Sequence, residues 1–298
     1  MRVPDGAELT DEDVPAFWAG LGLPGLADIH VHFLPPRMLA KVWSYFDNAE
    51  EHYGATWPVH YRYDEAERLT RLRALGVRGF PALAYPHKPG MAAWLNDWTL
   101  DFAERVEDCV PSATFYPDED ALSYVAAALD RGARIFKVHV QVGGFDPRLP
   151  VLDPVWGLLA EAGVPVVTHC GSGPLPGAFT GPAAMEQVLR RHPSLRLVIA
   201  HLGFPEYAEF VRLVTLYPRV VLDTTMAFTE YFQSRAPVPP EVLRQLADLG
   251  DRVVLGSDFP NIPYPYAHQI ESLARLDFGD DWLRAVLWHN GAKLMQLT

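Results

Sequence analysis

The sequence predicts an α/β fold, a (β/α)8 barrel built as a single domain. Helix-like segments that end near Gly or Pro alternate with short β-branched runs along the chain, a pattern typical of a parallel sheet. Eight such runs fit within the 298 residues, and a barrel of this kind needs ~250 residues. The main alternative is a doubly wound open sheet, but the G-x-G-x-x-G turn that usually follows its first strand is absent.

The expected strands follow from the β-branched runs and from the helix-like segments between them. Leu69, Leu72 and Leu75 recur at a spacing of three, as on one face of a helix. Asp64 is a suitable N-cap for this helix, and Gly76 suits the position after its last turn. Applied to the whole chain, such signals place strands that begin near residues 26, 77, 111, 134, 164, 195, 219 and 252.

We expect one domain over residues 1–298, with residues 1–25 as an N-terminal extension and a final helix over 280–296. Residues 34–63, after the first strand, break the regular alternation because they are long for one connection and dense in aromatic side chains. Such a segment is either a lid over the barrel mouth or a helix followed by a packed surface loop.

Composition limits the classes of protein and partner. The net charge is −12, with 37 acidic against 25 basic residues, which argues against a nucleic-acid partner. The only two cysteines, Cys109 and Cys170, cannot form a disulfide framework. No apolar signal segment is visible, and the longest uncharged stretch, 162–185, is interrupted by Gly and Pro. We expect a cytoplasmic protein with a small-molecule substrate and no membrane partner, and leave a homo-oligomer open.

Two histidines on the first strand are the strongest sign of chemistry. His30 and His32 are two residues apart, so their side chains share one face of a strand, ~6.6 Å apart along it. Imidazoles at this spacing can converge on one metal ion with Zn–N distances of about 2.1 Å.

Further polar residues come at the ends of later strands. His169, His201 and Asp258 each close a β-branched run, and His and carboxylate are common ligands of divalent metals. Because the C-terminal ends of all strands of a parallel barrel lie on one face, these residues should meet at one mouth. The alternative is that each has a structural role only, as a hydrogen-bonded residue of the core or as a helix cap.

The fourth strand, 134–142, also carries polar residues at alternate positions. Lys137 and His139 should point into the barrel, where an unpaired lysine is costly. Lys137 is therefore paired with an acid near the ligands, carbamylated so that it bridges two metals, or part of a structural ion pair. His139 is a candidate to contact substrate or to orient a ligand.

Taken together these residues resemble the amidohydrolase superfamily. The resemblance rests on the Asp-x-His-x-His motif at 28–32, on Lys137 and His169, and on the AHLG (200–203) and GSDFP (256–260) motifs. The two last motifs are similar to the amidohydrolase-related branch, which includes aminocarboxymuconate-semialdehyde and resorcylate decarboxylases and several lactone and amide hydrolases. The resemblance to the superfamily spans residues 26–298.

The resemblance implies a role for each of these residues. One divalent ion, with zinc the first expectation, would be held by His30, His32, His169 and Asp258. His201 and Asp258 would be the catalytic acid–base groups. A second ion would be present if Lys137 were carbamylated.

Other candidates stand on position alone. Arg62, in the long segment after the first strand, and Asn261, shortly after Asp258, are expected to bind substrate together with His139.

We therefore expect a metal-dependent hydrolase that cleaves an amide, lactone or related C–N or C–O bond with metal-activated water. The alternative is a metal-dependent nonoxidative decarboxylase of an aromatic or enoic acid, which would use the same ligands. A related nuclease would require an acidic ligand on the fourth strand and a positive mouth, and a non-enzymatic barrel would lack part of the ligand set; the sequence shows neither.

Overall fold

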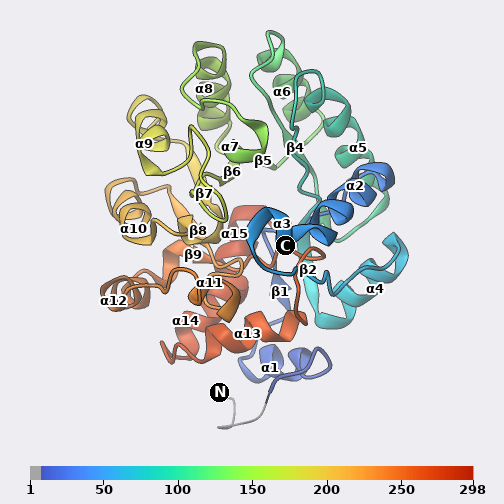
Figure 1. Cartoon of the computed structure of the whole chain (residues 1–298), viewed down its shortest axis with the longest axis vertical. Helices are drawn as coiled ribbons and strands as arrows, with labels where there is room; N and C mark the ends of the chain where they lie inside the picture. The colour runs from blue at the N-terminus through green and yellow to red at the C-terminus, as the bar shows by residue number, and fades with distance from the viewer. Residues whose placement is uncertain (1–7, 298) are drawn as a thin grey trace.

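A computed structural model describes residues 8–297 of the chain. Parallel strands form the centre, and helices surround them (Figure 1). The strands are β1 (Leu26–Ala27), β2 (Val77–Pro81), β3 (Cys109–Val110), β4 (Ser112–Thr114), β5 (Ile135–His139), β6 (Pro165–His169), β7 (Arg196–Ile199), β8 (Val221–Asp223) and β9 (Val253–Val254).

These strands occupy the eight positions of a (β/α)8 barrel, which confirms the predicted fold class. β3 and β4 are one strand interrupted at Pro111, because proline has no N–H to give to the ladder. The strands run in the order β1-β2-β3 and β4 through β9, all parallel. After β9, Leu255 O accepts from Ile29 N at 2.9 Å and Phe259 forms a parallel bridge with Val31, so the first and last strand positions are joined.

Helices alternate with the strands, and most of them lie around the outside of the ring, whereas α3 lies over its centre in this view (Figure 1). They are α1 (Val14–Gly20), α2 (Pro36–Asp47), α3 (Ala49–Tyr53), α4 (Glu65–Leu75), α5 (Ala92–Arg105), α6 (Ala121–Asp130), α7 (Val140–Gly143), α8 (Asp153–Ala162), α9 (Pro182–Arg191), α10 (Tyr207–Leu216), α11 (Glu230–Gln233), α12 (Pro240–Asp248), α13 (Tyr266–Ala274), α14 (Asp280–Arg284) and α15 (Asn290–Met295).

The predicted ends of α4 are confirmed. The Asp64 carboxylate accepts a hydrogen bond from Glu67 N at 2.9 Å and so satisfies a backbone donor of the first turn. Gly76 ends the helix with φ of 86°, a left-handed conformation that glycine adopts without a Cβ penalty.

Two expected boundaries differ from the structure. The fourth-position strand, β5, ends at His139 rather than at residue 142, because the His139 side chain accepts from Val142 N and caps the short helix α7. The expected final helix over 280–296 consists of α14, a π-helical turn over Ala285–His289 and α15. Residues 1–7 of the expected N-terminal extension lie outside the described residues, and α1 lies in the remainder.

The barrel interior changes from apolar to polar along the strands. Ile135 and Val167 belong to an inner hydrophobic cluster that Met295 of α15 joins. Two residues further along each strand, on the same face, come Lys137 and His169. The apolar layer thus supports polar groups at the C-terminal ends of the strands, the end at which such barrels carry their sites.

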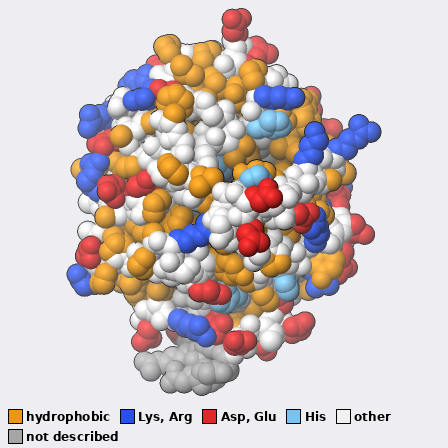
Figure 2. All heavy atoms as spheres, in the orientation of Figure 1, with side chains coloured by type: hydrophobic (Ala, Val, Ile, Leu, Met, Phe, Trp, Pro, Cys, Tyr) orange, Lys and Arg blue, Asp and Glu red, His pale blue; other side chains and the backbone are white. Residues whose placement is uncertain are grey.

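No helix within residues 8–297 is long and apolar enough to cross a membrane. On the face shown in Figure 2, charged side chains of both signs lie scattered among hydrophobic ones.

Asn96 of α5 gives a test of how the outer helices hold the strands. Its side chain donates to Thr114 O at 3.1 Å and accepts from Thr114 N at 2.7 Å, in a buried position. We expect Asn96→Ala to lower the free energy of unfolding by about 1–3 kcal/mol, because the substitution leaves buried backbone groups of β4 without partners. Urea denaturation measures this. Asn48→Ala, which removes an exposed bond to Ser44 O, is the control and should change stability by less than about 0.5 kcal/mol; equal losses in the two variants would contradict the account.

Candidate metal centre

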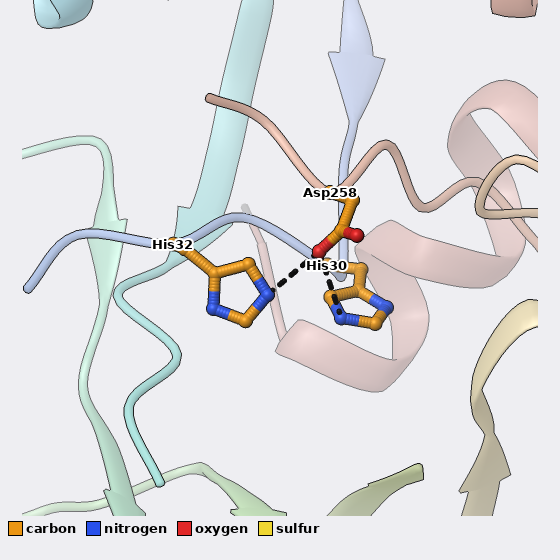
Figure 3. A group of neighbouring side chains, drawn as sticks. All are labelled: His30, His32 and Asp258. Atoms are coloured by element: carbon orange, nitrogen blue, oxygen red, sulfur yellow. Dashed lines mark ion pairs between the residues drawn. The ribbon is translucent and has the colours of Figure 1, made fainter. Parts of the chain in front are cut away.

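His30, His32 and Asp258 form a compact cluster at the mouth of the barrel (Figure 3). Asp258 Oδ1 lies 2.8 Å from His32 Nε2 and 3.6 Å from His30 Nε2. The two histidines follow β1, whereas Asp258 comes from the loop after β9. One potential ligand atom from each of the three residues lies within 4.8 Å of the others.

The hydrogen bonds of both imidazoles fit a metal site. His30 Nδ1 lies 2.9 Å from Asp223 Oδ2, and His32 Nδ1 lies 2.8 Å from Leu83 O. Because these oxygens only accept, each ring carries its proton on Nδ1 and keeps a lone pair on Nε2. Two donors at about 2.1 Å from one ion lie at most about 4.2 Å apart, and the Asp258–His distances meet that limit. The residues present therefore fit a divalent ion.

Asp223, at the end of β8, organises this cluster and was missed by the sequence analysis. Its Oδ2 contacts His30, and its Oδ1 accepts from His201 N at 2.8 Å and from Thr225 N at 3.1 Å. Burial alone would raise the pKa of this carboxyl, but the charge and the hydrogen bond of His30 lower the pKa below its usual range. Its position at the end of the seventh β-branched run was the signal available in the sequence, the same signal that marked His169, His201 and Asp258.

The backbone around the cluster is held in unusual conformations. Asp258 and His201 have φ of 69° and 57°, a region that costs energy for residues other than glycine. Asp258 N donates to His30 O at 2.8 Å, which fixes the two ligand-bearing segments to each other. A Cβ at Gly256 would meet Thr225 Oγ1 at 2.4 Å and His30 Cβ at 2.8 Å, so glycine permits this close approach.

Asp258 and His30 keep the charge states that a metal needs. Burial would raise the pKa of Asp258, but the close contact with the His32 ring and the nearby His30 lower the pKa well below its ordinary value. Burial, together with the Lys137 charge, lowers the pKa of His30 to about 4 against the opposing effect of Asp223 and Asp258. At neutral pH the carboxylate is charged and the imidazole is neutral, the forms in which they bind cations.

His169, predicted as a fourth ligand, is not within the compact three-residue cluster but lines the same cavity. Its Nε2 lies 3.0 Å from Gly173 O, so Nε2 carries the proton and Nδ1 keeps a lone pair. Its ring stacks on His139 at 3.9 Å between centroids and lies 4.7 Å from that of His201. Its role as a ligand remains a prediction.

His201 has the tautomer expected of an acid–base group. Its Nδ1 lies 3.1 Å from Thr225 O and therefore carries the proton, which leaves the lone pair on Nε2. Burial lowers its pKa to about 4, while the Asp258 charge acts in the opposite direction. The ring lines the cavity and lies 5.2 Å from that of His30.

Lys137 is buried beside the cluster. Its Nζ donates to His30 Nε2 at 2.9 Å, and burial lowers its pKa to about 8 against the opposing effect of Asp223 and Asp258. The structure thus places Lys137 next to the expected ligands, while its carbamylation remains a prediction.

The three residues expected to bind substrate are placed differently. His139 lines the cavity, and because its Nδ1 accepts from a backbone N–H, its Nε2 carries the proton as a donor. Asn261 also lines the cavity, but its Oδ1 accepts from Trp43 and its backbone O accepts from Trp57. The structure does not bring Arg62 to the cavity: it forms an exposed bidentate pair with Asp47, with N–O distances of 2.5 and 2.7 Å.

The cavity above the cluster has a volume of about 550 Å³. The segment 34–63 contributes a large part of its wall through α2, α3 and the following loop. The aromatic residues that line the cavity are Tyr45, Phe46, Tyr53, Trp57, Tyr85 and Phe232.

A parallel (β/α)8 barrel with a His–His–Asp cluster at the C-terminal ends of its strands defines a class of candidate metalloenzymes. The chain belongs to the amidohydrolase family, whose model matches residues 27–297. The resemblance seen in the sequence is thereby confirmed. No curated protein sequence matches the chain.

Solved structures share this fold at low sequence identity. An uncharacterised TIM-barrel protein from Bordetella bronchiseptica has a TM-score of 0.72 and 18% identity, with 90% of this chain and 98% of that chain covered. The 5-carboxyvanillate decarboxylase of Sphingomonas paucimobilis has a TM-score of 0.62 and 14% identity, with 93% and 100% covered. A probable 2-pyrone-4,6-dicarboxylic acid hydrolase of Acinetobacter baumannii has a TM-score of 0.60 and 14% identity, with 92% and 100% covered. Proteins named as a hydrolase and as a decarboxylase thus share this fold.

Asp223 can be tested through metal affinity. We expect Asp223→Asn to weaken zinc binding about 10- to 100-fold, because the partner that fixes the His30 tautomer loses its charge. Competition with a chromogenic chelator measures the affinity. Asp146→Asn, at a half-buried carboxylate that pairs with Arg148, is the matched control, and the idea fails if both variants bind zinc as tightly as the unchanged protein.

Proposed function

We propose that the protein is a metal-dependent hydrolase that cleaves an amide, lactone or related C–N or C–O bond of a small molecule with activated water. The convergence of two histidine Nε2 atoms and the Asp258 carboxylate, each locked in the form that binds a cation, carries this proposal. Zinc is the ion we propose, held by His30, His32 and Asp258, with His169 as the further ligand.

A divalent ion at this cluster would polarise the substrate carbonyl and lower the pKa of water. The Asp258 carboxylate, ionised and beside both histidines, is positioned to accept a proton from the attacking water. His201, neutral and with a free lone pair on Nε2, takes this proton over from Asp258 and delivers it to the leaving group, so that the proton lost by water ends on the product. The Nε2–H of His139, whose ring stacks on that of His169, supplies a further hydrogen-bond donor in the cavity.

The chemistry needs no thiol. Burial raises the pKa of Cys109 to about 12 and also raises that of Cys170, so both remain protonated, and neither forms a disulfide. Two unpaired buried thiols support the cytoplasm as the location we propose.

His201 offers a test of the acid–base assignment. We expect His201→Asn to lower kcat by about 10²- to 10⁴-fold while zinc content stays unchanged, because the variant loses proton transfer but keeps the ligands. Steady-state assays and metal analysis measure the two quantities. His192→Asn, at a histidine paired with Asp153, is the matched control; a His201→Asn enzyme with normal turnover would refute the role.

Labelled water tests the reaction itself. Turnover in H₂¹⁸O should place one ¹⁸O atom in the product, and removal of the metal by a chelator should abolish activity until zinc is restored. Mass spectrometry of the product measures the label. Unlabelled product with release of CO₂ would identify the decarboxylase instead, and full activity after complete removal of metal would exclude both reactions.

A further inference from the structure

The lysines of this chain are few, and two of them have no acidic partner among the described residues. The sequence contains four lysines: Lys41, Lys88, Lys137 and Lys293. Many of the arginines form ion pairs with carboxylates, as Arg62 does with Asp47. Lys41 and Lys88 form no ion pair with any residue of the described part, 8–297. In a protein with a net charge of −12, two unpaired neighbouring cations need an explanation.

One of these cations, Lys41, lies at the outer end of the cavity, and the other, Lys88, comes directly after a residue that lines it. Lys41 of α2 and His87, in the loop after β2, both line the cavity, and both are exposed. Lys88 follows His87 directly. Among the described residues that line the cavity, the only carboxylate is Asp258, which belongs to the metal cluster. The outer end is therefore a positively charged region with no acidic side chain in the cavity wall to neutralise it.

Both lysines lie within electrostatic reach of His87. Partial burial lowers the pKa of His87, and the charges of Lys88 and Lys41 lower it further. Two lysines from separate segments, one on α2 and one in the β2–α5 loop, thus create a positive potential around the His87 imidazole, which is neutral at pH 7. A bound anion would be stabilised at this place by its electrostatic attraction to the two lysines.

The β2–α5 loop sets the distance between this region and the metal cluster. Leu83 O holds His32, the Tyr85 ring lies 5.8 Å from that of His32, and His87 lines the outer end. Four residues of extended chain span at most ~14 Å. Aromatic side chains, among them Phe46 and Trp57, line the cavity that these two charged regions share.

We propose that Lys41, His87 and Lys88 form an anion-binding subsite at the mouth, so that the substrate carries a carboxylate or phosphate at the end remote from the bond that is cleaved. An apolar, ring-containing body would contact the aromatic wall and place the reacting carbonyl at the metal cluster. The substrate class rests on the proposed function; the subsite itself does not.

Binding of small probes tests the subsite without turnover. Benzoate, phenyl phosphate and the neutral benzamide are titrated against tryptophan fluorescence, with the protein both zinc-loaded and chelator-treated. We expect the anions to bind more tightly than benzamide, and Lys41→Gln or Lys88→Gln to weaken anion binding about threefold to fivefold, as for exposed charge pairs. Benzamide binding should not change, and the preference should shrink as salt is raised. The tighter of the two anions identifies the group that the subsite takes.

Lys293→Gln, at the lysine on α15 outside the cavity lining, is the matched control and should bind all three probes normally. Equal affinity for benzoate and benzamide would overturn the subsite, as would anion binding that neither Lys41→Gln nor Lys88→Gln weakens. An anion preference seen only in the zinc-loaded protein and unaffected by these variants would assign the anion to the metal and also overturn it. If the subsite behaves as expected while labelled water leaves no ¹⁸O in the product, the proposed hydrolysis fails and the subsite stands.

Discussion

A single buried carboxylate, Asp223, holds the candidate site together. It contacts the His30 ring with one oxygen and the backbone N–H groups of His201 and Thr225 with the other. Thr225 in turn fixes both histidines, through its hydroxyl 3.1 Å from His30 Nδ1 and its carbonyl oxygen at His201 Nδ1. The proton positions of both rings follow from these contacts, and with them which nitrogen can bind an ion and which can move a proton. Without this carboxylate, the same histidines could rotate and exchange tautomers.

The barrel supplies the environment in which such a network is stable. The inner apolar cluster, closed by Met295 of α15, excludes water from one side of the polar layer that begins at Lys137 and His169. In this low-dielectric setting a lysine and several imidazoles prefer to be neutral, which accounts for the lowered pKa values of Lys137 and His201. The ionised Asp223 and Asp258 oppose that tendency, because a nearby negative charge raises the pKa values of Lys137 and His201.

The segment 34–63 turns this polar layer into a selective cavity. Its side chains add an aromatic wall and one cation, while Asn261, three residues beyond Asp258, ties Trp43 and Trp57 to the loop that carries the ligand. The two ends of the cavity consequently differ in chemistry, with the candidate metal ligands at the inner end and Lys41 at the mouth. A substrate that binds at both ends of the cavity is held in one orientation, and this orientation places its reacting bond at the cluster.

The sequence by itself determined the barrel and the end of it that carries the polar residues, because strand periodicity and strand order depend on local patterns. For the same reason it indicated that His30, His32 and Asp258 lie close together. It did not show that Pro111 splits the third strand or that His139 ends the fourth one as a helix cap, since both depend on hydrogen bonds to neighbouring backbone. Asp223 was missed and Asn261 was found to hold two tryptophans, because their partners lie far away in the sequence. Arg62 was found on the surface with Asp47, a residue of the same segment, because the path of the chain between them follows no regular pattern. Which nitrogen of each histidine carries the proton, and which lysine lines the cavity, were decided only by the tertiary structure, since both depend on contacts between segments that the fold alone brings together.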